Sequence, residues 1–135
     1  MELSFLHVAD YANVTGDQKL NVMGIFGNIT ASGFPTVHPE MYLVAQLSAS
    51  AAEYGRQFKL SIKLLDEDAS KELISFAQDI SVPVGQGGLP VQMNVNLLLV
   101  NTLFPSPGTY EFVVLVDGDD KGSRRLEVIQ SPQGV

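Results

Sequence analysis

The fold is decided by residues 107–129, which read PGTYEFVVLVDGDDKGSRRLEVI. The Pro-Gly pair at the start is typical of a turn, because proline fixes φ and glycine accepts positive φ. Mostly aromatic and β-branched residues follow, which is the composition of a strand. Asp117-Gly118 opens a second turn, and a return strand runs over 125–129. The stretch predicts a β-hairpin with a loop longer than two residues over 117–122.

The first strand of this hairpin has two different faces. Side chains alternate along a strand, so Tyr110, Phe112 and Val116 share one apolar face, while Val113 and Leu115 lie on a second face that is only partly polar. A tyrosine at the start of such a strand bonds back to the main chain in Ig-like sandwiches. Tyr110 is predicted to form this tyrosine corner.

Working outward from the hairpin, the rest of the chain alternates in the same way between turn signals. Two glycines, at positions 24 and 27, indicate a bulge or a close backbone approach inside one strand. No segment has convincing helical periodicity. The prediction is an all-β fold, an antiparallel β-sandwich of about eight strands that is Ig-like or jelly-roll-like and has no significant helix. The strands are expected at 3–12, 19–29, 41–50, 57–64, 72–82, 91–100, 110–116 and 125–129.

Length and composition limit the class of protein. A chain of 135 residues is expected to form one domain over 1–135, with 130–135 as a frayed tail. A domain of this size buries enough surface to fold without a disulfide or metal. The chain has no cysteine, which excludes disulfides, thiolate chemistry and cysteine-based zinc sites.

The charge and the hydropathy pattern indicate a soluble protein. A net charge of −7 disfavours phosphate backbones and anionic membrane surfaces, so neither nucleic acid nor a membrane is an expected partner. The first residues lack the basic and apolar regions of a signal peptide, and no apolar run approaches the ~20 residues of a membrane span. The expected location is cytoplasmic.

Several segments together resemble a family of short bacterial all-β proteins of unknown function. The resemblance spans nearly the whole chain and implies a sandwich with no assigned catalytic, metal or ligand residues. The segments that carry it are FLHVADYA at 5–12, KLNVMGIF at 19–26, Phe34-Pro35 with His38-Pro39, GTYEF at 108–112 and VDG at 116–118.

The sequence contains no catalytic constellation. There is no Gly-x-Ser-x-Gly elbow, and the two imidazoles, His7 and His38, are better interpreted as hydrogen-bonded structural residues than as catalytic bases. The glycines of 85–88 lack the Gly-Lys-Ser/Thr and helix of a phosphate loop. They are interpreted as part of a flexible loop over 83–90. The protein is therefore predicted not to be an enzyme and to need no cofactor.

Calcium binding is the alternative that the acidic turns keep open, because Ca²⁺ takes six to eight oxygen ligands. If every connection reverses direction, Asp17, Asp117, Asp119 and Asp120 share one end of the sandwich. The acidic run at 66–68 then lies at the opposite end. The competing interpretation is that aspartate and glycine are good turn formers. A calcium- or carbohydrate-binding sandwich that uses this end remains the second hypothesis.

The leading hypothesis is a non-catalytic binding or assembly module that acts through a sheet face or a loop end. Val113 and Leu115, with Leu98 and Val100 on another strand, add more apolar character than a solvated sheet face needs. Exposed apolar patches commonly mark interfaces, and a symmetric dimer is the commonest assembly. These four residues are the predicted interface of a self-associating protein.

Overall fold

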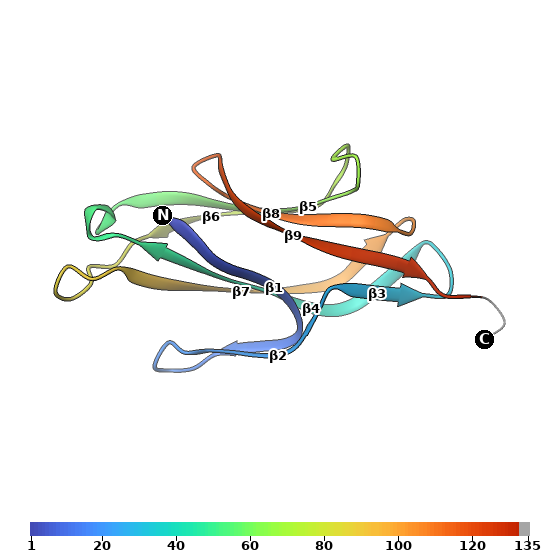
Figure 1. Cartoon of the computed structure of the whole chain (residues 1–135), viewed down its shortest axis with the longest axis horizontal. Helices are drawn as coiled ribbons and strands as arrows, with labels where there is room; N and C mark the ends of the chain where they lie inside the picture. The colour runs from blue at the N-terminus through green and yellow to red at the C-terminus, as the bar shows by residue number, and fades with distance from the viewer. Residues whose placement is uncertain (133–135) are drawn as a thin grey trace.

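The computed structural model describes residues 1–132 and consists of two β-sheets packed face to face (Figure 1). The first sheet has the order β2-β1-β4-β7, and the second has the order β3-β9-β8-β5-β6. The all-β sandwich is confirmed, with nine strands in the described residues. They are β1 (Glu2–Val14), β2 (Leu20–Phe26), β3 (Asn28–Ala31), β4 (Thr36–Ala49), β5 (Gln57–Leu65), β6 (Glu72–Ser81), β7 (Val91–Phe104), β8 (Gly108–Val116) and β9 (Asp119–Gln130), with one 3₁₀ turn at Ala51–Glu53.

The additional strand arises because the segment predicted at 19–29 is divided at Gly27. Before Gly27, β2 pairs with β1 in the first sheet; after it, β3 pairs with β9 in the second. The Gly27 carbonyl already accepts a hydrogen bond from the Glu127 N–H of β9, at 2.9 Å. The pairing of β3 with β9 is parallel, so the sandwich is not antiparallel throughout as predicted.

The turn between β8 and β9 is shorter than predicted. Asp117 (φ 50°) and Gly118 (φ 83°) both have positive φ, which is the geometry of a two-residue type I′ hairpin. The register shifts between Val114 and Leu115, where the partner strand contains one extra residue. Because of this bulge, β9 contains one more residue than the facing segment of β8. The longer loop predicted over 117–122 was therefore wrong.

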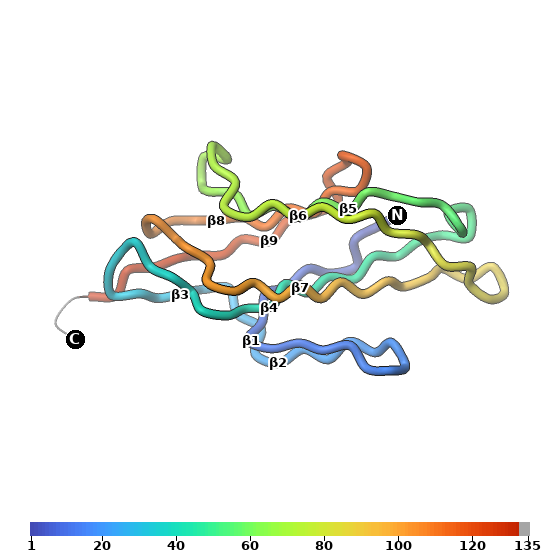
Figure 2. Tube along the Cα trace, turned by 180° about the vertical axis from the view of Figure 1, so that it is seen from behind, coloured from blue at the N-terminus to red at the C-terminus, as the bar shows by residue number. Residues whose placement is uncertain are grey.

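The β1–β2 hairpin turns back against the outer face of the first sheet (Figures 1 and 2). We call residues 10–25 the arm. The bend lies near Gly24, where φ is 73° and a Cβ atom would come within 2.6 Å of an Asp10 carboxylate oxygen. Two side-chain amides of β7 hold the arm: Asn96 donates to the Ala12 carbonyl at 3.1 Å, and Asn94 donates to the Gln18 carbonyl at 2.9 Å.

The hydrophobic core lies between the two sheets. Alternating residues of each central strand point inward, and the largest fully buried ones include Phe104, Phe112, Met41, Leu43 and Leu126. The left-handed conformation of Asn101 (φ 54°) interrupts the alternation of β7, so that Thr102 and Phe104 are buried beyond it while Leu103 is exposed. This interruption places the site described below.

The first residues of the tail predicted at 130–135 are part of the fold. Gln130 is the last residue of β9, and the Ser131 N–H donates to the Ala31 carbonyl at 2.9 Å. Residues 133–135 of the predicted tail lie outside the described residues. Within residues 1–132, no helix is long and apolar enough to cross a membrane.

Candidate functional site

The predicted acidic site is divided between two turns. Asp17 lies in the turn of the arm, where bonds from the Thr15 hydroxyl and the Lys19 ammonium lower the pKa of its carboxyl. Asp117 accepts a bond from the Lys59 N–H of the neighbouring strand β5 at 2.7 Å. Each carboxylate therefore has a partner in its own sheet or turn.

Figure 1 shows these two turns at the same end of the molecule but on opposite sides of it. The turn between β8 and β9 projects above the second sheet, whereas the turn of the arm lies below the first. Asp120 accepts a bond from the Gly122 N–H at 3.0 Å. Among residues 1–132, no group of three or more His, Asp or Glu side chains is arranged to hold a metal. The structure does not bring the four predicted residues together.

The predicted interface residues differ in exposure between the two sheets. On the second sheet, Val113 is only 9% exposed and Leu115 is half-buried. Val113 lies between Lys63 and Ser123 on the neighbouring strands, and the Lys63 ammonium pairs with Glu72 of β6 at 2.8 Å. This face offers little apolar surface.

On the first sheet, the predicted residues are exposed. Leu98 is 46% exposed and Val100 is 59% exposed on the outer face of β7. Beyond Asn101, Leu103 pairs with Val37 of β4, and both are exposed. We call Val37, Leu98, Val100 and Leu103 the apolar strip.

The arm extends the apolar strip. The Tyr11 ring packs against Tyr42 with centroids 5.3 Å apart, and Tyr42 is the cross-strand partner of Leu98. Met23 pairs with Tyr11 across the arm and is 65% exposed. Together the strip and the arm form one outer face with exposed large apolar side chains.

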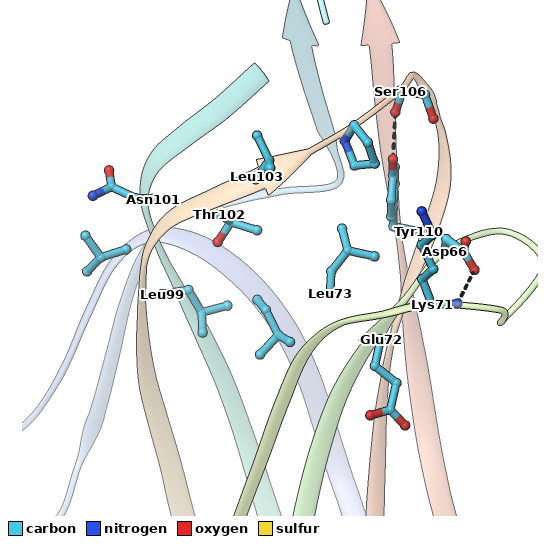
Figure 3. Close-up of a pocket in the computed structure, with 13 residues that line it drawn as sticks. Asp66, Lys71, Glu72, Leu73, Leu99, Asn101, Thr102, Leu103, Ser106 and Tyr110 are labelled. Carbon is cyan, nitrogen blue, oxygen red and sulfur yellow. Dashed lines mark hydrogen bonds between the residues drawn. The ribbon is translucent and has the colours of Figure 1, made fainter. Parts of the chain in front are cut away.

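The side of the sandwich next to the apolar strip is open. β6 and β7 are edge strands of the two sheets, and a cavity of about 750 Å³ lies between them near the end of β7 (Figure 3). Leu73 of β6 and Leu99 and Leu103 of β7 contribute apolar walls, and Lys71 lies at the rim. The cavity is a gap in the core that the two edges leave uncovered.

Two residues give this cavity its polar groups and its rigidity. Thr102 is the buried polar residue among those described, and its side chain lines the cavity. The Tyr110 hydroxyl donates to the Ser106 carbonyl at 2.6 Å, and its ring packs edge-on against Phe104. The predicted tyrosine corner is confirmed, and it fixes the turn that closes one end of the cavity.

The histidines lie apart from this cavity, and both contact aromatic rings. The His7 ring stacks on Phe5 with centroids 5.9 Å apart, and the His38 ring lies 5.8 Å from that of Phe26. His38 belongs to β4 and not to a loop, as its place before Pro39 had suggested. Burial, and then the charge of Arg124, lower the pKa of His7.

The sequence gives one signal for the open side that the prediction did not use. Residues 91–104 contain no charged residue, no proline and no glycine. This absence distinguishes β7 from the other long strands. It does not indicate that β7 lies at a sheet edge, because that depends on the order of strands far apart in the chain.

The fold and the site define an all-β sandwich with one open side and an exposed apolar face. The chain belongs to the family of unknown function DUF6941, whose family model matches residues 4–129. The comparison with curated proteins gave no match.

One similar solved structure is the Pseudomonas fluorescens alkylpurine DNA glycosylase AlkC bound to DNA containing an abasic site analog. The TM-score is 0.47 and the identity is 15%, over 93% of this chain. The chain spans only 30% of that one. A likeness at this level carries no argument about what the present protein does.

Proposed function

We propose that this protein is a non-catalytic assembly module that associates with a second copy of itself through the first sheet. The observation that carries the proposal is the distribution of exposed large apolar side chains. Most of those in residues 1–132 lie on the apolar strip or on the arm next to it. Contiguous apolar surface of this kind is typical of protein interfaces.

The charge distribution supports this choice of surface. Two copies of a chain with net charge −7 repel each other, so association requires a surface that carries little charge. The apolar strip consists of valine and leucine, and Glu40 is the charged residue opposite Val100. The second sheet is less suitable, because its outer face contains Lys63, Glu111 and Arg125 next to the buried Val113.

Light scattering over a range of concentrations tests the proposal. We expect the wild-type protein to be a dimer and the double variant Leu98→Lys/Val100→Lys to be a monomer with an unchanged circular dichroism spectrum. Val84→Lys is the matched control, because Val84 is 76% exposed but lies in the loop between β6 and β7. A wild-type protein that stays monomeric up to millimolar concentration would overturn the proposal.

A further inference from the structure

We infer that the second copy joins along β7, main chain to main chain, so that two first sheets continue into one antiparallel sheet. This inference rests on the proposed self-association and specifies its contact. It makes the open edge, with the apolar strip beside it, the centre of the interface. The inference comes from a comparison of the edge strands, from burial along β7 and from charge.

The four edge strands of the two sheets differ in how they are protected. Proteins protect edges with short strands, bulges, proline or charged residues, because an open edge is a template for another strand. β3 has four residues. β2 has seven, and Gly24 with φ 73° interrupts it. β6 contains Glu72 and Asp79.

β7 has almost none of these protections. It runs for 14 residues and contains no charge, proline or glycine. The left-handed Asn101 changes the facing of its side chains near its end and leaves Val91–Val100 regular. This segment pairs with β4 on one side only within the described part of the chain. Its outer main-chain groups are free to pair with another strand.

Burial along β7 indicates that a neighbouring strand is needed. Met93, Val95 and Leu97 point toward the core, yet each is only half-buried. Their cross-strand partners on β4 (Leu47, Ala45 and Leu43) are almost fully buried in the same layer. A strand laid beside β7 covers these side chains and removes their apolar surface from water.

A second copy fits this edge better than a strand of another composition. The longest antiparallel pairing of two β7 strands that keeps core-facing residues on the core side is centred on Val95 or Asn96. It brings the apolar core-facing residues of the two copies against one another, and neither strand carries a charge. Leu98 and Val100 of both copies then lie on one outer face, at the two ends of the pairing, with Asn94 and Asn96 between them.

Hydrogen exchange measured on the wild-type protein tests the pairing directly. Edge pairing protects main-chain amides, whereas packing of side chains on a sheet face does not. We expect peptides within 91–100 to exchange about tenfold more slowly in the dimer than in dilute monomer. Peptides from β6 should exchange equally in both. A dimer in which residues 91–100 exchange as fast as in the monomer would overturn the pairing and leave the proposed function intact.

A matched pair of variants gives the second test. Val95→Lys places an inward-pointing charge on the edge, which is a natural way to block strand addition. Ile80→Lys makes the same change at a half-buried, core-facing position of β6. We expect Val95→Lys to weaken dimerisation at least about 100-fold and Ile80→Lys to leave it unchanged. Val95→Thr, which keeps the branched shape without a charge, should remain a dimer.

The outcomes separate the two proposals. A monomeric wild-type protein contradicts both of them. A dimer that persists in Val95→Lys but dissociates in Leu98→Lys/Val100→Lys contradicts edge pairing and supports packing through the face alone. If Val95→Lys does not fold, the exchange measurement on the wild-type protein still decides the question. Protection of 91–100 that appears only with another protein, and not with concentration, also overturns the inference.

Discussion

The two long sides of the sandwich are built differently. On one side, β1 of the first sheet lies against β9 of the second, and a Cβ atom on Gly122 would come within 2.6 Å of the Leu3 Cδ2. Arg124 shares the inward face of β9 with Leu126 and points a charge toward this seam. On the other side, β6 and β7 leave a cavity of about 750 Å³ between them.

The difference shows what each side can do. An inward-pointing charge and close backbone contact prevent further strands from adding to an edge. The closed side therefore completes the fold of a single chain. The open side has half-buried core residues, a long uncharged strand and an apolar strip beside it. It is the side where a contact with another molecule adds burial that the single chain lacks.

The largest expected effect comes from matched leucine truncations on the two sides of the first sheet. Leu6 of β1 and Leu97 of β7 both point toward the core from strands that flank β4. Leu6 is buried, whereas Leu97 is half-buried. In dilute protein, Leu6→Ala should lower the free energy of unfolding by about 2–5 kcal/mol, and Leu97→Ala by roughly half as much.

Urea unfolding at two protein concentrations makes this comparison quantitative. If β7 pairs with a second copy, the cost of Leu97→Ala grows with protein concentration, while the cost of Leu6→Ala stays constant. Equal costs for both variants in dilute monomer would contradict the distinction between a closed and an open side.

The next effect tests the contact that closes the seam. Gly122→Ala places a methyl group against the Leu3 side chain, whose flexible end must move. We expect a loss of about 1–2 kcal/mol in the free energy of unfolding, as is usual for overpacking. Gly16→Ala is the control, because no atom lies within 4 Å of a Cβ built there. Thermal unfolding of both variants measures the effect, and an unchanged Gly122→Ala midpoint would argue against the close contact.

A smaller effect on the free energy of unfolding tests the tyrosine corner at the end of the cavity. Tyr110→Phe removes the hydroxyl that donates to the Ser106 carbonyl at 2.6 Å. The expected cost is about 1 kcal/mol, because the acceptor remains next to water at the cavity rim. Tyr11→Phe should change stability far less, since Tyr11 is 45% exposed and its ring contact with Tyr42 is kept. Chemical denaturation of the two variants shows whether the Tyr110 hydroxyl stabilises the fold more than the Tyr11 hydroxyl does.

Local patterns were sufficient to predict some of these features. Alternation alone located β8, and the position of Tyr110 after Pro107-Gly108 predicted its bond to the main chain. These depend on residues close together in the chain. The parity of connections was not sufficient to place Asp17 and Asp117, because the division at Gly27 makes Asp117 follow the eighth strand and not the seventh. The arm also turns back near Gly24 through a local bend that parity ignores.

Other features depend on distant residues, and the sequence pattern was silent about them. The β3 segment alternates in the same way whichever sheet it joins, and its partner β9 lies about a hundred residues further along the chain. Val113 is as apolar as Val100, yet one is covered and the other is open. Val113 lies on β8, between β9 and β5, whereas Val100 lies on an edge strand, and no analysis of residues 110–116 reveals this order. Prediction of the cavity likewise requires knowledge that β6 and β7 are the edge strands of their sheets.

The smallest effect is a pH dependence from His7 of β1. Burial, and then the nearby Arg124, lower the pKa of His7 from its usual 6.5. The His7 Nδ1 atom is buried and has no hydrogen-bond partner within the described residues. The folded state therefore takes up this proton less readily than the unfolded state does.

The sign of the effect follows from that difference. Above about pH 7, His7 is neutral in both states and contributes nothing to the pH dependence. As the pH falls through 6.5, the unfolded chain binds the proton while the folded protein resists it, so stability declines toward acid. His7→Phe keeps a ring that stacks on Phe5 and removes the titration. Unfolding free energies measured from about pH 7 to about pH 5 should decline less steeply in this variant than in the wild-type protein. Parallel profiles would mean that His7 is solvated in the folded state.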